Sequence, residues 1–430
     1  MTQKKVLILS YYWPPSGGSG VQRWMYFAKY LKEFGVLPTV ITVDEQYASY
    51  PNKDMSFNEL IKDIEVHKTK TLEPLRFYSF LKSGKSNKVV PQGNVGGKKK
   101  GIFDKIATYV RANFFMPDAR VGWNRYAFNK AKELLQKEHF DLVITTGPPH
   151  STHLVGQKLK KEFGINWMAD FRDPWTEVYY NNLFKRTPKN EALDQTMEIN
   201  VLHDADSILT VGPSMMKLLA DKVPHQKDKF HYIYNGFDAE KFQQLKKQKN
   251  ETFTIRYVGT LSENYPYKTT IEAINQLAID KKSLTIELIG NIETSVLEYF
   301  QENCLFPITN ILSVSHTEAI QFMKNADMLL LLLPFMKHAQ IMLTGKLFEY
   351  LATENPILCI GDKKADAAAI VNQLANSKSF EENETSEITQ FIERIHKKEW
   401  SNLNTSLDIQ RFSRYETARE LSEWIKNRKN

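Results

Sequence analysis

Short apolar runs alternate along this chain with longer stretches in which apolar residues recur about every three to four positions. The runs predict strands buried on both faces, and the longer stretches predict helices with one apolar stripe. In the first half the predicted strands are Val6–Ser10, Thr39–Val43, Leu142–Thr145, Asn166–Asp170 and Ser207–Val211. In the second half they are Thr254–Val258, Thr285–Ile289, Ile311–Val314, Met328–Leu333 and Ile357–Ile360. The pattern therefore predicts an α/β fold with two parallel-sheet halves in tandem.

A chain of 430 residues is longer than a single hydrophobic core usually serves, so two domains are expected. The boundary is predicted between the segment His231–Asp238, a strand that ends in the turn signal Asn235-Gly236, and the polar run from Lys241 to Glu251. A last periodic stretch, Tyr415–Lys429, predicts a helix that could pack on either domain. The predicted parts are residues 1–238, 239–408 and 409–430.

One stretch interrupts the alternation. Residues 82–101 carry several lysines and glycines and no acidic residue, and an aromatic-rich, basic segment follows at 102–116. This composition predicts a flexible basic loop and then a helix. Two interpretations remain open, namely a patch that rests on an anionic membrane and receives a lipid-linked acceptor, or a solvated loop with an ordinary core-facing helix.

The bulk composition narrows the cellular setting. Two cysteines, Cys304 and Cys359, favour a reducing compartment and exclude a disulfide framework or a Cys-rich zinc site. The start of the chain resembles a strand rather than a signal peptide, and the longest apolar run, Met328–Leu333, is too short to cross a bilayer. A cytoplasmic location is therefore expected, with the inner face of the cell membrane as a further candidate. The net charge of +7 suggests an anionic partner.

The first predicted strand leads into a glycine-rich loop with Gly17, Gly18 and Gly20, placed just before a predicted helix. Bare backbone and a helix N-terminus together attract anions such as a diphosphate. The glycine spacing matches neither the dinucleotide fingerprint nor a Walker loop, which disfavours NAD and ATP. A plain connecting turn is the alternative.

Polar residues also follow two later strands of the first half, and in open α/β sheets this edge holds ligands. His150 and, less strongly, His153 could hydrogen-bond a substrate hydroxyl, although a loop histidine is often structural. Asp170 and Asp173 flank Arg172, and clustered charges of this kind often mark functional sites. The alternative is an internal salt bridge that fixes the loop.

In the second half, Gly259 and Thr260 end a strand and Lys268 follows. Further along, Thr344, Gly345 and Lys346 begin a predicted helix, and small residues there leave amide groups open to phosphate oxygens. Glu349, one turn later, could accept hydrogen bonds from sugar or ribose hydroxyls, or could simply face solvent. The sequence contains no HExxH motif, no Cys/His metal spacing and no G-x-S-x-G elbow, so neither a metal site nor acyl-enzyme chemistry is expected.

With these motifs the chain resembles retaining glycosyltransferases of family 4, which have the GT-B fold. The matching segments are Pro14–Gly18, Asn235–Asp238, Gly259–Leu261, Leu288–Gly290, Asn325–Asp327 and Lys346–Ala352 with Pro356. The segment Asp170–Trp175 is similar to a variant found in members that build cell-surface polysaccharides. The resemblance implies two Rossmann-like domains that face each other across a cleft, with the last helix crossing back to the first domain.

The resemblance also implies the reaction. A nucleoside diphosphate sugar would bind mainly to domain two and a glycan or lipid-linked acceptor to domain one, with retention and without metal, cofactor or nucleic acid. Lys268 and helix N-terminal amides would stabilise the leaving diphosphate, Gly17, Gly18 and Gly20 would lie beside it, and Glu349 would hold the ribose. The catalytic candidates are Asp173, Arg172, His150 and Lys268, and the donor-binding candidates also include Gly259, Thr260, Thr344, Gly345 and Lys346.

Three positions depart from the family pattern. Ile341 stands where a second glutamate usually contacts the donor sugar, Thr260 replaces an arginine, and Arg172 stands near a usual histidine. Two other functions therefore stay open. A nucleotide-sugar epimerase of the same fold would need a water-positioning carboxylate, for which Asp170 and Asp173 are the candidates. A non-catalytic homologue that binds a nucleotide or glycan is the other.

Overall fold

The computed structural model describes residues 3–48, 50, 53–73, 109–178, 186–312, 314–399 and 407–428. The chain forms two compact units. The first unit comprises residues 1–234 and 417–430, and the second unit comprises residues 235–416. The predicted basic loop 82–101 lies outside the described residues, and of the predicted helix 102–116 the described part is helical at 109–114.

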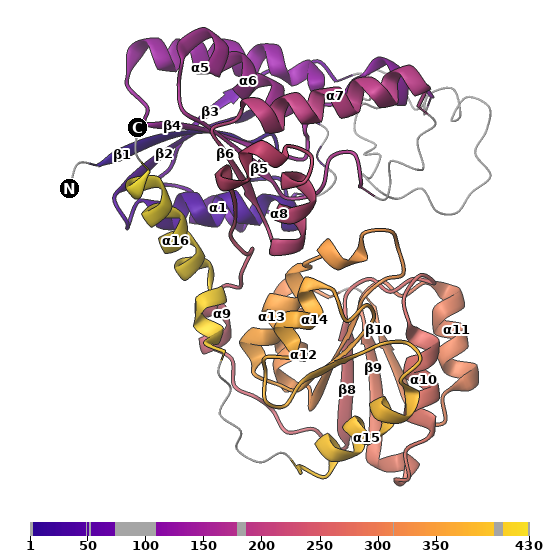
Figure 1. The fold of residues 1–430 in the computed structure, drawn as a ribbon. Coiled ribbons are helices and arrows are strands. Elements are labelled where there is room, and N and C mark those ends of the chain that lie inside the picture. Colours follow the sequence, from indigo (N-terminus) through magenta and orange to yellow (C-terminus); the bar gives the residue numbers. More distant parts are fainter. Residues whose placement is uncertain are drawn as a thin grey trace. The chain divides into compact units, whose positions relative to one another are not determined.

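The first unit is a seven-stranded sheet in the order β3-β2-β1-β4-β5-β6-β7, and all its paired strands are parallel. Its strands are β1 (Lys4–Leu9), β2 (Val36–Val43), β3 (Glu65–Thr69), β4 (Leu142–Gly147), β5 (Trp167–Phe171), β6 (Ser207–Thr210) and β7 (Phe230–Tyr232). Its helices include α1 (Ser19–Leu31), α2 (Phe57–Leu60), α5 (Asn124–Lys137), α6 (Ser151–Phe163), α7 (Pro188–Asp204) and α8 (Pro213–Ala220). Helices α5, α6 and α7 lie on one face of the sheet and α1 on the other (Figure 1).

The last helix, α16 (Arg414–Asn427), completes the core of the first unit. Ala418, Leu421 and Ile425 of α16 are buried in the same apolar cluster as Val6 of β1 and Trp24 of α1. The C-terminal stretch of the chain therefore stabilises the N-terminal sheet.

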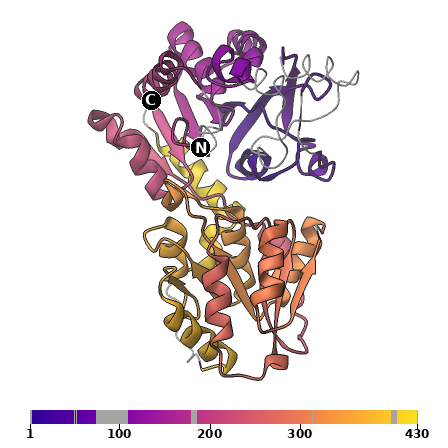
Figure 2. The same cartoon turned by 90° about the vertical axis from the view of Figure 1, so that its right-hand side faces the viewer.

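The second unit is a six-stranded parallel sheet in the order β10-β9-β8-β11-β12-β13. Its strands are β8 (Phe253–Val258), β9 (Leu284–Ile289), β10 (Ile308–Ile311), β11 (Met328–Leu332), β12 (Ile357–Ile360) and β13 (Lys378–Phe380). Its helices are α9 (Ala239–Gln243), α10 (Tyr267–Asn275), α11 (Thr294–Asn303), α12 (His316–Asn325), α13 (Gly345–Thr353), α14 (Asp366–Val371) and α15 (Thr385–His396). Helices cover both faces of this sheet (Figures 1 and 2).

The prediction of two parallel-sheet α/β halves is confirmed, with corrections at three strands. The strand predicted at Ile311–Val314 was placed three residues too late in the sequence, because β10 spans Ile308–Ile311. Strands β3 and β13 were not predicted. Both lie at sheet edges, where one side of the strand has no partner and a continuous apolar run is not needed.

Each sheet reverses its strand order once. In the first unit the reversal falls between β1 and β4, and in the second it falls between β8 and β11. At such a point the loops from the two neighbouring strands leave in opposite directions, and open α/β sheets bind ligands there, at the carboxyl ends of the strands. The loops that follow β1, β4, β8 and β11 are therefore the places to look for a site.

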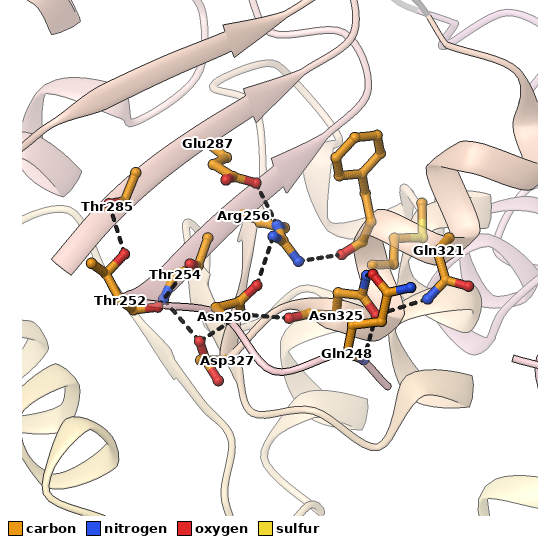
Figure 3. Close-up of polar contacts among 12 residues, drawn as sticks. Gln248, Asn250, Thr252, Thr254, Arg256, Thr285, Glu287, Gln321, Asn325 and Asp327 are labelled. Atoms are coloured by element: carbon orange, nitrogen blue, oxygen red, sulfur yellow. Dashed lines mark hydrogen bonds and ion pairs between the residues drawn. The ribbon is translucent and has the colours of Figure 1, made fainter. Parts of the chain in front are cut away.

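The motif Asn325-Ala326-Asp327 lies at the opposite, N-terminal end of the second sheet. Asp327 Oδ2 accepts hydrogen bonds from the Thr254 backbone amide at 3.0 Å and from Asn250 Nδ2 at 2.7 Å. Asn325 Oδ1 accepts one from the Gln248 backbone amide at 3.0 Å (Figure 3). These contacts fix the segment that leads into β8, so we assign this motif a structural role.

Candidate functional site

The loop after β1 holds Gly17 and Gly18, and Gly20 lies in the first turn of the helix that follows. Gly18 has φ +96°, a left-handed backbone region that favours glycine, and a side chain there would meet open space. Helix α1 begins directly after it, and Gly18 at the N-cap position offers no side chain to cap the helix. No acidic residue stands in the first turn of α1. The first amide groups of α1 can therefore receive an anion.

Arg172 connects this glycine loop to the loop after β4. Its guanidinium donates hydrogen bonds to the carbonyl oxygens of Gly20 and Pro148, and its Nε donates to that of Gly147 at 3.2 Å. A Cβ atom on Gly20 would lie only 2.8 Å from Arg172 Nη1. The structure thus brings Arg172 and Gly20 together at the reversal point of the first sheet.

The two carboxylates at the carboxyl end of β5, Asp170 in the strand and Asp173 in the loop after it, differ in environment. Asp170 is fully buried, and its Oδ2 accepts hydrogen bonds from Trp24 Nε1 at 2.6 Å and from Thr146 Oγ1 at 2.8 Å. Its Oδ1 accepts one from Arg23 Nε at 3.2 Å. Asp173 is exposed and forms no hydrogen bond with any described residue. Asp173 is therefore accessible to a ligand, whereas Asp170 is part of the framework.

Arg23 is an important residue that the sequence did not reveal. It is buried on α1, and besides Asp170 its guanidinium donates to the carbonyl oxygens of Ile233 at 2.8 Å, Thr210 at 3.3 Å and Tyr234 at 3.4 Å. Arg23 thus ties α1 to the carboxyl ends of β5, β6 and β7. Because the partners of Arg23 are distant in sequence, the sequence pattern of α1 did not indicate that this arginine is buried and bonded.

His150 and His153 pack against aromatic rings at the start of α6. The His150 ring stacks on Trp175 with centroids 5.1 Å apart and 10° between the planes, and His153 stacks on Phe171 at 4.5 Å. Burial, with a contribution from the charge of Arg172, lowers the pKa of His150 to about 3. Burial also lowers the pKa of His153 well below its usual value. Both rings are therefore neutral at neutral pH.

Several buried polar atoms around these loops have no hydrogen-bond partner of good geometry among the described residues. They are both ring nitrogens of His150, His153 Nε2, Tyr11 Oη, Trp13 Nε1, Ser16 Oγ and Thr152 Oγ1. They come from the loop after β1 and from the loop after β4 with the first turn of α6, and β1 and β4 are neighbouring strands. Since buried polar atoms are normally satisfied, such a group favours the binding of a polar ligand or water at this edge.

Helix α7 holds the loop that carries Asp173. Asp194 Oδ1 accepts a hydrogen bond from Trp175 Nε1 at 2.8 Å, and Glu198 Oε2 accepts one from Thr176 Oγ1 at 2.6 Å. Lys222 Nζ, 2.7 Å from Glu198 Oε2, compensates the charge of that buried carboxylate. The position of Asp173 is therefore set by residues just beyond it in the loop.

In the second unit, α13 begins after the loop that follows β11. Its N-cap residue, Thr344, makes no side-chain capping bond, Gly345 is exposed, and the first turn contains no acidic residue. The neighbouring helix α12 differs, because Ser315 and Glu318 form a capping box at its start. The first amides of α13 can thus bind an anion, whereas those of α12 are already used.

Lys346 extends from the first turn of α13 toward the end of β8. Its Nζ lies 2.8 Å from Tyr257 Oη and would lie 2.9 Å from a Cβ atom on Gly259, whose φ is +130°. Burial lowers the pKa of Lys346 to about 8, although the Glu349 carboxylate acts in the opposite direction. The glycine therefore leaves room for an ammonium group at the reversal point of the second sheet.

Thr260 and Lys268 are the other two candidates that follow β8. Thr260 is exposed directly after Gly259. Lys268 is exposed on α10, and its Nζ lies over the ring of Tyr299 on α11, 5.3 Å from the ring centroid. The structure brings Gly259 and Lys346 together and directs Lys268 toward α11.

Glu349 lies one turn into α13, and its Oε1 is 2.8 Å from Nε2 of His316, the first residue of α12. Ile341 is buried at the end of a short 3-10 helix, Ala339–Ile341. At the position of the missing glutamate the chain therefore places an apolar side chain in the protein interior.

The described residues contain neither a metal-binding cluster nor a membrane-spanning helix. No group of three or more His, Cys, Asp or Glu side chains is arranged to hold a metal ion within the parts of the chain that the structure describes. In the same parts, every helix is too short or too polar to cross a membrane.

Known proteins resemble this chain in one sequence region and in fold. Residues 93–241, less than half of the chain, match the family model of Glycosyltransferase Family 4. No curated protein matches the chain in sequence.

Three solved structures illustrate the likeness in fold. A glycosyltransferase from Rickettsia africae ESF-5 is 14% identical, with a TM-score of 0.61 and all of both chains covered. Anabaena HepE in complex with UDP and glucose is 13% identical, with a TM-score of 0.55 over 99% of this chain and 100% of that one. A proposed UDP-N-acetylglucosamine 2-epimerase from Listeria monocytogenes is 12% identical, with a TM-score of 0.52 over 99% and 96%. The fold is therefore of the GT-B class.

Proposed function

We propose that the chain is a glycosyltransferase that moves a sugar from a nucleoside diphosphate sugar to a hydroxyl of a glycan or lipid-linked acceptor, with retention of configuration. The match of residues 93–241 to the family 4 model and the GT-B fold support this proposal. The observation that carries it is the start of α13, where uncapped amides, Lys346 and Gly259 meet at the reversal point of the second sheet.

This place suits a diphosphate. The α13 amides donate hydrogen bonds in a fixed direction, and the helix end adds partial positive charge. The Lys346 ammonium supplies a full charge beside them, and its partner Tyr257 is neutral because burial raises the pKa of that phenol well above its usual value. A leaving diphosphate gains negative charge as the glycosidic bond breaks, so these groups would stabilise the transition state more than the bound donor.

The first unit suits a hydroxylated acceptor. Its edge offers the exposed carboxylate of Asp173, the neutral imidazole of His150 and the buried polar atoms of the loop after β1. In this proposal Arg172 is a positioning residue, because its guanidinium is engaged by backbone carbonyls of both loops. The amides at the start of α1 offer a further contact for an anionic group.

The proposed reaction needs no protein nucleophile. The bond between the anomeric carbon and the phosphate oxygen breaks, and the acceptor oxygen forms a new bond to the same face of that carbon. The acceptor hydroxyl gives its proton to the departing phosphate oxygen, so charge and atoms balance. Because Lys346 and the helix amides supply the positive charge, we propose that neither metal nor cofactor takes part.

A panel of UDP- and GDP-sugars tests the function. We expect one donor to release its nucleoside diphosphate only when a glycan or lipid-linked acceptor is added, with the anomeric configuration of the product unchanged by NMR. A chelator should not reduce the rate. Release without an acceptor, together with an epimerised sugar, would instead identify an epimerase.

Two alternatives make different demands on the site. An epimerase needs a carboxylate that can position water, and of the two candidates only Asp173 is exposed, since Asp170 is buried and bonded. A non-catalytic binding protein is suggested by the buried Ile341, which cannot contact a donor hydroxyl through a polar atom. Tight nucleotide binding with no turnover of any donor in the panel would identify the latter.

We further propose that the protein works in the cytoplasm and touches the anionic inner face of the cell membrane through its first unit, where a lipid-linked acceptor would be presented. Tyr109 and Phe114 of the helical segment 109–114 are exposed, Phe114 by 72%. The preceding lysine-rich segment lies outside the described residues. Exposed aromatic side chains beside a basic sequence are typical of peripheral membrane contacts.

Replacing Phe114 by serine should therefore weaken binding to vesicles that contain phosphatidylglycerol roughly five- to tenfold, because an inserted aromatic ring is lost. Vesicle flotation at several lipid concentrations measures the effect. Leu305→Ser is the matched control, because Leu305 is exposed on the second unit. Equal binding by the wild type and the Phe114 variant, or an equal loss with the control, contradicts the membrane proposal.

A further inference from the structure

His316, at the start of α12, contacts the carboxylate of Glu349 and has no role in the mechanism proposed above. His316 Nε2 lies 2.8 Å from Glu349 Oε1, while the other carboxylate oxygen, Oε2, has no hydrogen-bond partner among the described residues. Glu349 is mostly covered, with 16% of its side chain exposed, and His316 is exposed by 44%. The pair therefore presents one fixed and one open oxygen at the surface of the second unit.

The place of the open oxygen follows from helix geometry. Glu349 is four residues after Gly345, so it lies about 6 Å further along the α13 axis than the amides proposed to hold the diphosphate. In a nucleoside diphosphate the ribose hydroxyls lie about one such step from the phosphates. A glutamate one helical turn beyond the phosphate-binding amides is therefore within reach of the ribose of the same nucleotide.

We propose that His316 is a positioning residue that holds Oε1 of Glu349 so that Oε2 is presented to the ribose hydroxyls of the donor. The inference rests on the proposed function, since it assumes a nucleoside diphosphate at α13. His316 is itself fixed, because the capping box of Ser315 and Glu318 sets the first turn of α12. Holding one oxygen removes rotational freedom from the glutamate before the ligand arrives.

A simple surface pair is the competing interpretation, and such pairs contribute little. The two differ in what they predict for ligands. If His316 and Glu349 form only a surface pair, removing His316 changes the binding affinity of no ligand. If it positions Glu349, its removal affects only ligands that carry ribose hydroxyls.

The test is a binding experiment by calorimetry on the full chain. Its probes are UDP or GDP, whichever the wild type binds more tightly, the matching 2′,3′-dideoxynucleoside diphosphate, and pyrophosphate. His316→Ala should weaken binding of the ribonucleotide about three- to tenfold, as expected for one lost hydrogen bond, and should leave the other two probes unchanged. His316→Gln should restore most of the loss, because its amide nitrogen can replace Nε2 as the donor to Glu349.

A double-mutant cycle separates positioning from direct contact. In a Glu349→Ala background, which leaves His316 no acceptor at position 349, adding His316→Ala should cause no further loss. The matched control is His203→Ala, because His203 is an exposed histidine of the first unit whose Nδ1 lies 2.9 Å from Asp204 Oδ1.

The outcomes are distinct. An unchanged ribonucleotide affinity in His316→Ala, an equal loss for the dideoxy analogue, or an undiminished loss in the Glu349→Ala background overturns the inference while leaving the proposed function intact. If the wild type binds pyrophosphate but neither nucleoside diphosphate, the proposed function fails as well.

Discussion

Replacing Lys346 by methionine should weaken binding of a nucleoside diphosphate roughly 30- to 150-fold, because a charge-assisted hydrogen bond to a phosphate contributes about 2 to 3 kcal/mol. Methionine keeps the length and apolar stem of the side chain, so its packing against Tyr257 is largely retained. The fold should therefore survive, and calorimetry with UDP and GDP measures the loss directly.

Lys268 is the informative comparison. The family resemblance assigns it to the diphosphate, whereas the structure places its ammonium over Tyr299 of α11. We expect Lys268→Met to cause the smaller loss of the two lysine variants. A larger loss for Lys268→Met would contradict the assignment to Lys346 and return the role to Lys268.

The pH dependence gives a second measure of the same group. The pKa of Lys346 is lowered to about 8 in the free protein, and a bound diphosphate should raise it. The charged form binds, so affinity is high below pH 8 and is lost as the pH rises. Between pH 7 and pH 9 the affinity of the wild type should fall about tenfold, because the charged fraction falls by about that factor. Lys346→Met should show a flat profile over this range.

Replacing Asp170 by asparagine should destabilise the first unit by about 3 kcal/mol or more. The variant leaves the buried guanidinium of Arg23 without its counter-charge, which is the costly way to break a buried ion pair. Arg23 keeps its bonds to three carbonyl oxygens, which places the expected loss at the lower end of the usual range of about 3 to 5 kcal/mol.

Tryptophan fluorescence during denaturant unfolding can follow this loss, because Trp400 is the single one of the seven tryptophans whose position falls within residues 235–416. Asp173→Asn is the matched control, three positions further along the chain in the loop after β5. Since Asp173 is exposed, its change should alter stability by less than about 0.5 kcal/mol while reducing transferase activity. Similar unfolding midpoints for the two variants would show that Asp170 is not the framework residue proposed here.

Much of the fold was predictable because the strands that build the middle of each sheet are buried on both faces. Val6–Ser10 and Ile357–Ile360 are continuous apolar runs, and β1 and β12 lie there. The short edge strand β3, Glu65–Thr69, has a polar sequence, and its pairing with β2 cannot be recognised without knowing where β2 lies. The prediction placed β10 too late in the sequence, because Leu312 and Val314 extend the apolar pattern beyond Ile311, where the strand ends.

The sequence also predicted only one part of the candidate site. Glycines before helices, as at Gly18 and Gly345, are visible in the sequence because the residue type itself carries the signal. Which side chains meet is not visible. The sequence grouped Asp170 and Asp173 around Arg172, and both carboxylates do act on the charge of that guanidinium. It did not reveal that Asp170 also forms an ion pair with the buried Arg23. Such pairings depend on how distant strands and helices pack.

The return of α16 to the first unit has a consequence for how such proteins can be recombined. The second unit is, in topology, an insertion between residues 234 and 417 of the first. Exchanging it for the corresponding part of a relative therefore requires two junctions. A chimaera made with a single crossover near residue 235 would fill the core beside β1 with a foreign last helix in place of Ala418, Leu421 and Ile425. The second unit, with the proposed donor site, could be exchanged between relatives only when both junctions move together.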